Sequence, residues 1–123
     1  MLDAGALIAL DRHDAAMWGR LAAARAARRP LLSHAGIIGQ VWRQPARQAR
    51  LARVVRAIDV RPLTLEIAKQ VGLLLAATGH ADVHDSALAL LCEDGDTVLT
   101  SDVDDLGELL WAAGRRAVDI VLV

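Results

Sequence analysis

The chain has 123 residues, which suffices for one domain with a substantial core, and we expect a single domain over residues 1–123. No apolar run reaches the roughly 18 residues of a membrane-spanning helix, so we do not expect a membrane protein, and the first residues lack the pattern of a secretory signal. The single cysteine, Cys92, excludes an internal disulfide. The net charge of −1 conceals an asymmetry, since residues 1–61 carry 11 Lys and Arg against 4 Asp and Glu (+7) and residues 62–123 carry 3 against 11 (−8).

This asymmetry has two interpretations. A basic face would suit a phosphate-bearing partner and an acidic pocket would suit a cation, but the two halves could equally form two differently solvated surfaces. The absence of a membrane segment and of paired cysteines favours a soluble protein of the reducing cytoplasm.

Strands and helices are expected to alternate along the chain. In order, the pattern predicts a strand at 1–3, a turn or short helix at 4–10, a helix at 15–28, a strand at 31–34, helices at 35–43 and 46–57, a strand at 58–61, helices at 65–78 and 83–93, a strand at 97–100, a helix at 104–112 and a strand at 118–123. Asp14, Thr64 and Asp82 are the expected N-caps, and Gly79 and Gly114 the expected helix stops. The alternation predicts the α/β class, with a central parallel sheet covered by helices on both faces.

Three acidic residues that are far apart in the sequence are expected at one end of this sheet. Asp3 and Asp102 each follow a strand, and ligands of open α/β sheets bind at the carboxyl ends of the strands. Asp85 lies in the first turn of a helix, in line with the apolar residues Leu88 and Cys92, so it starts on the buried side. Converging carboxylates repel one another unless a cation neutralises them, and their oxygens suit Mg²⁺ or Mn²⁺.

Helix capping is the competing explanation for these acids. The pairs Asp82-x-x-Asp85 and Asp102-x-x-Asp105 both have the spacing of capping residues. We favour capping for Asp82 and Asp105 and a functional role for Asp3, which we expect to lie where no cap is needed. A functional role for Asp85 and Asp102 is favoured only if both lie beside Asp3.

The chain resembles the PIN-domain ribonucleases, specifically the VapC-type toxins of bacterial toxin–antitoxin pairs. Three segments carry the resemblance in matching order and spacing, namely residues 2–10 (LDAGALIAL), 82–87 (DVHDSA) and 99–106 (LTSDVDDL). The resemblance implies a three-layer α/β/α fold with a central parallel sheet of four or five short strands. It also implies a homodimer that cuts RNA with Mg²⁺ or Mn²⁺ and is inhibited by a cognate antitoxin protein.

By position, the resemblance assigns the metal-binding and catalytic acids to Asp3, Asp85 and Asp102. Family members usually carry a Glu where this chain has Gln40, which we include among the catalytic candidates, and often a Thr or Ser where it has Ala4 and Gly5. The amide removes one negative charge, so we expect at most one tightly held metal in the free protein. Residues that could support the site from outside are Asp82, Asp104, Asp105 and His84.

Candidate RNA-binding residues lie around the fourth expected helix. Arg43, Arg47 and Arg50 are the cations nearest to the proposed site in the sequence, although arginines on such a face more often serve solvation. Trp42 is the aromatic residue nearest to the site, and His34 ends a strand beside it. A satisfied structural histidine is the competing explanation for His34 and His84 alike.

These observations favour a metal-dependent endoribonuclease toxin, a hydrolase that cuts RNA phosphodiester bonds with a metal-activated water. One alternative is a PIN-like protein with weak or no cleavage that binds RNA or regulates, for which Gln40 is the best argument. A weaker alternative is a receiver-like domain that accepts phosphate on an Asp. That class needs a lysine at a late strand end, and the only lysine, Lys69, falls inside an expected helix.

Overall fold

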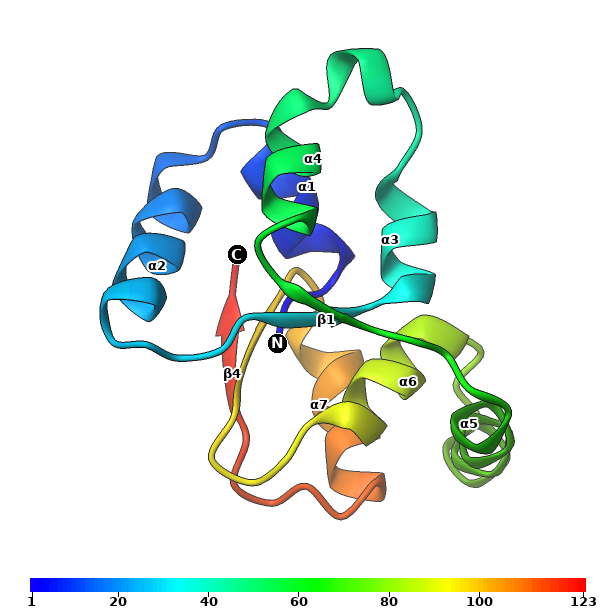
Figure 1. The fold of residues 1–123 in the computed structure, drawn as a ribbon. Helices are drawn as coiled ribbons and strands as arrows, with labels where there is room; N and C mark the ends of the chain where they lie inside the picture. Colours follow the sequence, from blue (N-terminus) through cyan, green and yellow to red (C-terminus); the bar gives the residue numbers. More distant parts are fainter.

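Short strands and helices alternate along all of residues 1–123 in the computed structural model, so the protein belongs to the mixed α/β class (Figure 1). The elements are, in order, α1 (Ala4–Asp11), α2 (Ala15–Ala26), β1 (Leu32–His34), α3 (Ala35–Val41), the 3₁₀ helix η1 (Pro45–Arg47), α4 (Ala49–Val55), β2 (Asp59–Arg61), α5 (Leu65–Thr78), α6 (Val83–Leu91), β3 (Thr97–Thr100), α7 (Val103–Ala112) and β4 (Asp119–Leu122). Every expected element after residue 3 is present within a few residues of its predicted bounds, except one helix that is divided.

Local capping explains most helix boundaries. The side chains of Asp14, Thr64 and Asp82 accept hydrogen bonds from backbone N–H groups in the first turns of α2, α5 and α6, which confirms the three predicted N-caps. Gly79 ends α5 in the left-handed conformation, with φ of 76°. The helix expected over residues 46–57 is divided into η1 and α4, because the Gln48 side chain accepts from the backbone of Arg43 and Gln44 and holds that turn in place.

The strands form two parallel two-stranded sheets, β1 with β2 and β3 with β4. A single central sheet of four or five strands is therefore not present in the predicted form. Residues 1–3 connect the two sheets instead, because Leu2 N–H donates to Leu32 O at 2.8 Å and Asp3 N–H donates to Leu99 O at 3.1 Å, while Leu2 forms an isolated parallel bridge with Leu99. Each strand has only three or four residues, and β1 and β4 run in different directions (Figure 1).

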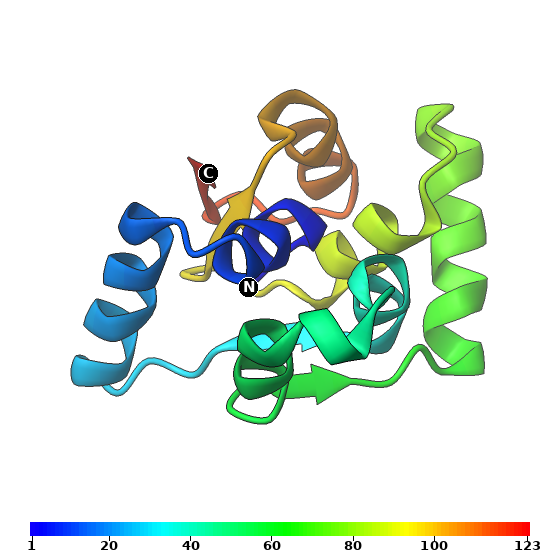
Figure 2. The same ribbon diagram turned by 90° about the horizontal axis from the view of Figure 1, so that it is seen from above.

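The helices pack in two groups. Helix α1 contacts α2, α3 and α4, whereas α5, α6 and α7 contact one another, and the strands lie between the two groups (Figures 1 and 2). The fully buried leucines Leu7 and Leu10 of α1 and Leu88 of α6 belong to one apolar core that both groups share. None of the helices combines the length and apolar character that crossing a membrane requires.

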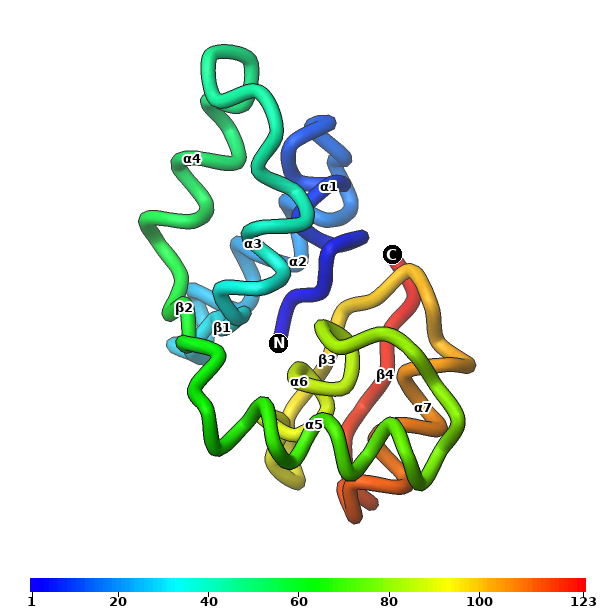
Figure 3. Tube along the Cα trace, turned by 90° about the vertical axis from the view of Figure 1, so that its right-hand side faces the viewer, coloured from blue at the N-terminus to red at the C-terminus, as the bar shows by residue number.

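This arrangement brings three helix N-termini close together. Asp3, Asp82 and Asp102 are the N-caps of α1, α6 and α7, and these helices start from three separate parts of the chain. Figure 3 shows the same two helix groups from the side, with η1 and the start of α4 far from α6 and α7.

Candidate functional site

Asp3 is the most enclosed acid of the chain, with 5 % of its surface exposed. Its Oδ1 accepts the N–H of Ala6 at 2.6 Å and its Oδ2 accepts the N–H of Ser101 at 3.1 Å. Asp3 therefore caps α1, and the expectation that it lies where no cap is needed was wrong. The two hydrogen bonds fix the direction of the carboxylate and tie it to the loop that follows β3.

Asp102, not Asp105, is the N-cap of α7. The Asp102 carboxylate accepts the N–H of Asp105 at 3.2 Å, and the N–H of Asp102 itself donates to the Thr100 hydroxyl at 2.9 Å. The expectation that Asp105 caps this helix was wrong, because the helix begins at Val103 and places Asp105 in its first turn. Both carboxylates are exposed, so both are accessible from solvent.

Asp85 is the half-buried acid at the centre of the group. The pKa of its carboxyl is raised from 3.8 to about 6, mostly by burial and then by the negative charges of Asp82, Asp3, Asp102 and Asp105, in that order. Acids from three chain segments therefore act on Asp85, and Asp3 and Asp102, which we expected beside it, are among them. Asp104 does not belong to this group and lies in a shallow hollow beside Glu108 and Trp111.

Asp82 supports the position of Asp85 through the backbone. Its Oδ1 accepts the N–H of His84 at 2.7 Å and the N–H of Asp85 at 2.9 Å. The first turn of α6 is therefore held by a carboxylate that also contributes negative charge beside Asp85. The cap suits a helix N-terminus, where partial positive charge favours an anion.

Three side chains on α3 and α6 have buried polar atoms without a hydrogen-bond partner. They are Oε1 of Gln40 on α3, and Nδ1 of His84 and Oγ of Ser86, the two neighbours of Asp85 in the chain. An unpaired buried acceptor is costly unless a donor or cation completes it. Helix α3 packs against α1, but no hydrogen bond joins Gln40 to any of the carboxylates.

His34 has a structural role. The residue is fully buried, its Nδ1 accepts the N–H of Gly36 at 3.1 Å, and its Nε2 donates to the carbonyl of His84 at 2.8 Å. Burial lowers the pKa of the imidazole, consistent with the neutral ring that these two bonds require. Because His34 has no exposed surface, its burial favours the structural role over the predicted RNA contact.

The other candidate RNA-binding residues are all exposed and lie together at the end of α3, on η1 and on α4. Arg43 donates to the carbonyl of Gly39 at 2.8 Å, whereas the side chains of Arg47 and Arg50 make no hydrogen bond or ion pair. This segment is distant from the N-termini of α6 and α7 in two perpendicular views (Figures 1 and 3). RNA would have to extend from the acids along α3 to reach all three arginines and Trp42.

The donors fit a hard divalent cation in kind, because carboxylate oxygens and the unpaired amide oxygen of Gln40 are the ligands that Mg²⁺ and Mn²⁺ prefer. No three side chains of His, Cys, Asp or Glu stand close enough together in this conformation to hold a metal ion. A metal at Asp3, Asp85 and Asp102 would therefore require side-chain movement, most readily by the exposed Asp102.

The sequence did not show which residues approach two of the glycines, Gly5 and Gly36. A Cβ at Gly5 would overlap the Ser101 side chain, and a Cβ at Gly36 would overlap the His84 ring. Ser101 and His84, the residues that approach these glycines, directly precede Asp102 and Asp85 in the chain. The two glycines were the only sequence signal for these contacts, and a glycine alone does not say which residue approaches it.

Searches against protein-family models, curated proteins and solved structures returned no match to this chain.

Proposed function

We propose that the protein is a metal-dependent endoribonuclease, a toxin of the VapC type with a PIN-like fold whose sheet is drawn together by residues 1–3. The observation that carries the proposal is the convergence of Asp3, Asp85 and Asp102, which come from three distant segments and start, or lie in the first turn of, three helices. Capping alone explains Asp3 and Asp102 individually. It does not explain why a half-buried third acid, Asp85, lies among them at a cost to the folded state.

In this proposal Asp3, Asp85 and Asp102 hold Mg²⁺ or Mn²⁺, with Gln40 as a neutral oxygen donor. The bound cation supplies polarisation of the scissile phosphate and lowers the pKa of a water molecule. Asp85 must release its proton to serve as a ligand. Asp82 holds the turn that carries Asp85, and the Asp3–Ser101 hydrogen bond holds the turn that precedes Asp102.

The helix N-termini have a second role. The N-terminal ends of α1, α6 and α7 carry partial positive charge, which reduces repulsion within the acid group and attracts an RNA phosphate. The exposed arginines at the end of α3 and on α4 then give a longer RNA chain a basic surface beyond the acids. A cognate antitoxin would inhibit by covering the acids with an apolar helix and an arginine, and a homodimer is the proposed assembly.

A second candidate is a PIN-like protein that binds RNA without cutting it. Two observations favour it, namely the uncharged Gln40 and the absence of three ligands close enough together to hold a metal. A receiver-like phosphoacceptor has less support, because Lys69 lies on the exposed side of α5 and not at a strand end.

Expression in bacterial cells tests the proposal directly. Without an antitoxin the wild-type chain should arrest growth and reduce intact RNA, and Asp3→Asn or Asp85→Asn should relieve the arrest. Asp104→Asn is the matched control, because Asp104 lies outside the acid group, and it should remain toxic. Arrest that persists in both Asp3→Asn and Asp85→Asn at equal protein levels would reject metal-dependent cleavage, and RNA binding without cleavage would favour the second candidate.

A further inference from the structure

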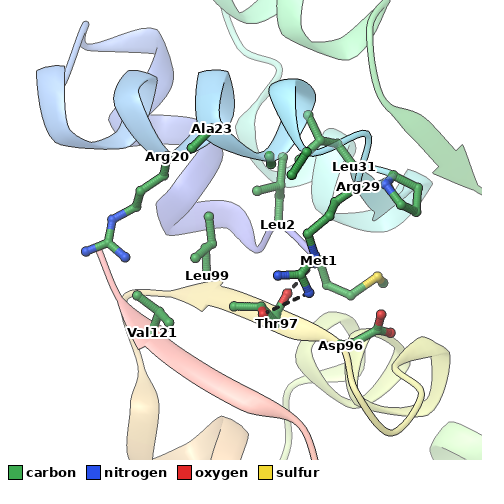
Figure 4. Close-up of a pocket in the computed structure, with 13 residues that line it drawn as sticks. Met1, Leu2, Arg20, Ala23, Arg29, Leu31, Asp96, Thr97, Leu99 and Val121 are labelled. Carbon is green, nitrogen blue, oxygen red and sulfur yellow. Dashed lines mark hydrogen bonds between the residues drawn. The ribbon is translucent and has the colours of Figure 1, made fainter.

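A hollow of about 410 Å³ lies between α2 and the strands, apart from the acid group. Its floor includes Leu2, Leu99 and Val121, and its roof includes Ala23 of α2 (Figure 4). Thr97 and Leu99 of β3 also line the hollow, and none of the five acids of the group does. The hollow is therefore separate from the acid group.

The side chains of α2 explain why the hollow exists. The first half of the helix is anchored, because Met17 and Leu21 are fully buried and the indole N–H of Trp18 donates to Leu10 O at 3.1 Å. In the second half, the residues that line the hollow are Ala23 and Ala24, followed by Ala27 just after the helix, and their methyl groups are too short to fill the space. Leu99 and Val121 on the apolar floor are therefore only half-buried, whereas Leu2 is buried.

Charges at the edge of the hollow favour an anion. Arg20 and Arg29 lie on opposite sides of it, and both extend from the α2 side toward the strands (Figure 4). Arg29 donates to the Thr97 hydroxyl at 3.2 Å, whereas Arg20 makes no hydrogen bond or ion pair. Asp96 is the only acid of the lining, and its carboxylate accepts the N–H of Glu93 at 2.9 Å.

We propose that this hollow binds a small amphiphilic anion, a molecule with an apolar body and a single carboxylate or phosphate head. The apolar lining favours the body, and the volume falls within the range of about 300–1,000 Å³ typical of small-molecule pockets. Arg20 holds the head, because its planar guanidinium can donate two parallel hydrogen bonds and has no competing partner within the molecule. Arg29, already bonded to Thr97, closes the opposite side.

Calorimetric titration of the intact protein with decanoate and with decyl phosphate, both below their micelle concentrations, tests this proposal. Each should bind at one site. Arg20→Gln should weaken binding about tenfold or more, the loss expected for a hydrogen bond between charged groups, whereas Arg25→Gln, on the same helix but outside the hollow, should bind as wild type. Decanol should bind far more weakly, because it has no charge for Arg20.

A second pair of variants tests the location. Ala24→Leu should fill the hollow and abolish binding, and Ala22→Leu, exposed on the same helix, should not. Circular dichroism checks that Ala24→Leu is folded, and Ala27→Leu replaces it if it is not. Decanoate binding that survives a folded filling variant, or equal affinity for decanol, would overturn the proposal.

The source of the anion is resolved by adding vesicles of anionic phospholipid. Retention on vesicles that Ala24→Leu abolishes would identify a lipid as the source, and titration by free amphiphile with no retention would identify a soluble molecule. Vesicle binding with no titration by monomeric amphiphile would overturn the proposal. A dimer in sedimentation that Ala24→Leu disrupts, without amphiphile binding, would also overturn it, because the hollow would then be an interface between two copies.

Discussion

The carboxylate of Asp3 accepts a hydrogen bond from the backbone N–H of Ser101 at 3.1 Å, although 98 residues separate the two in the chain. The same carboxylate caps α1. One side chain therefore holds the N-terminal segment, the first helix and the loop that leads to Asp102. The hydrogen bond therefore helps to hold Asp3 close to the segment that contains Asp102.

Replacement of Asp3 should separate its structural role from its proposed metal role. Asp3→Ala removes a cap, about 0.5–2 kcal/mol, and leaves the Ser101 N–H without its buried acceptor, about 1–3 kcal/mol more. Asp3→Asn keeps one acceptor oxygen and should lose less. Urea unfolding followed by circular dichroism measures both, with Asp14→Ala as the control, because Asp14 caps α2 and accepts no long-range bond. Equal losses for Asp3→Ala and Asp14→Ala would contradict the linking role.

Gly5 should tolerate no larger residue while Ser101 is present. The added Cβ of Gly5→Ala overlaps the Ser101 side chain, so this variant should unfold at a lower urea concentration. Ser101→Gly in the same chain should restore part of the loss. Gly19→Ala is the control, because nothing lies near a Cβ there and the helix should gain about 0.5–1 kcal/mol. The interpretation fails if Gly5→Ala stabilises the protein as Gly19→Ala does.

The raised pKa of Asp85 should appear in the pH dependence of the free energy of unfolding. The folded state raises the pKa of Asp85 to about 6 from 3.8, mainly through burial and then through the neighbouring acids, so it binds the proton more tightly than the unfolded chain does. Protonation of the Asp85 carboxyl therefore makes the metal-free protein more stable as the pH falls from about 7 toward 3.8. Above pH 6 the ionised Asp85 carboxylate opposes folding.

Asp85→Asn should be more stable than wild type at pH 7.5 without metal, and the difference should vanish near pH 4. His34 acts in the opposite direction, since its lowered pKa makes the folded state lose stability as the pH falls through 6.5. It is present in both proteins, so the difference between their thermal unfolding curves isolates Asp85. A variant that is less stable than wild type at pH 7.5 would show that the ionised carboxylate stabilises the fold.

Gln40→Glu should couple metal binding to stability. In this variant a negatively charged carboxylate replaces a buried, unpaired amide oxygen. Because burying an unpaired charge is costly, the metal-free variant should unfold at a lower temperature than wild type. Mn²⁺ should raise its unfolding temperature more than it raises that of wild type, because the added charge strengthens the proposed site. Gln70→Glu, exposed on α5, provides the control and should show neither effect. Weaker Mn²⁺ stabilisation of Gln40→Glu than of wild type would exclude Gln40 from the site.

Much of the fold could be predicted from the sequence because its signals are local. Asp14, Thr64 and Asp82 cap helices within three residues of themselves, and Gly79 ends α5 through its own φ angle. Such features depend on neighbours in the chain, so a sequence pattern contains them. The order of strands and helices follows from apolar periodicity in the same way.

The details of the site depend on distant contacts that no local pattern contains. We predicted that Asp3, Asp85 and Asp102 lie together, but the sequence did not show that the N–H of Ser101, 98 residues away, donates to Asp3. From the sequence we assigned the cap of α7 to Asp105, whereas Asp102 is the cap. Both side chains can cap a helix, and only the exact first residue of α7 distinguishes them. The burial of His34 likewise depends on the carbonyl of His84, 50 residues away.

The most direct test of the central claim is cleavage of an end-labelled structured RNA by the purified protein, with Mn²⁺ and with EDTA. We predict discrete cuts with Mn²⁺ only, their loss in Asp3→Asn and Asp85→Asn, and their retention in Asp104→Asn, whose carboxylate lies outside the acid group. Equal cleavage in EDTA, or full activity of both Asp3→Asn and Asp85→Asn when folded, would contradict a metal-dependent ribonuclease built on these acids.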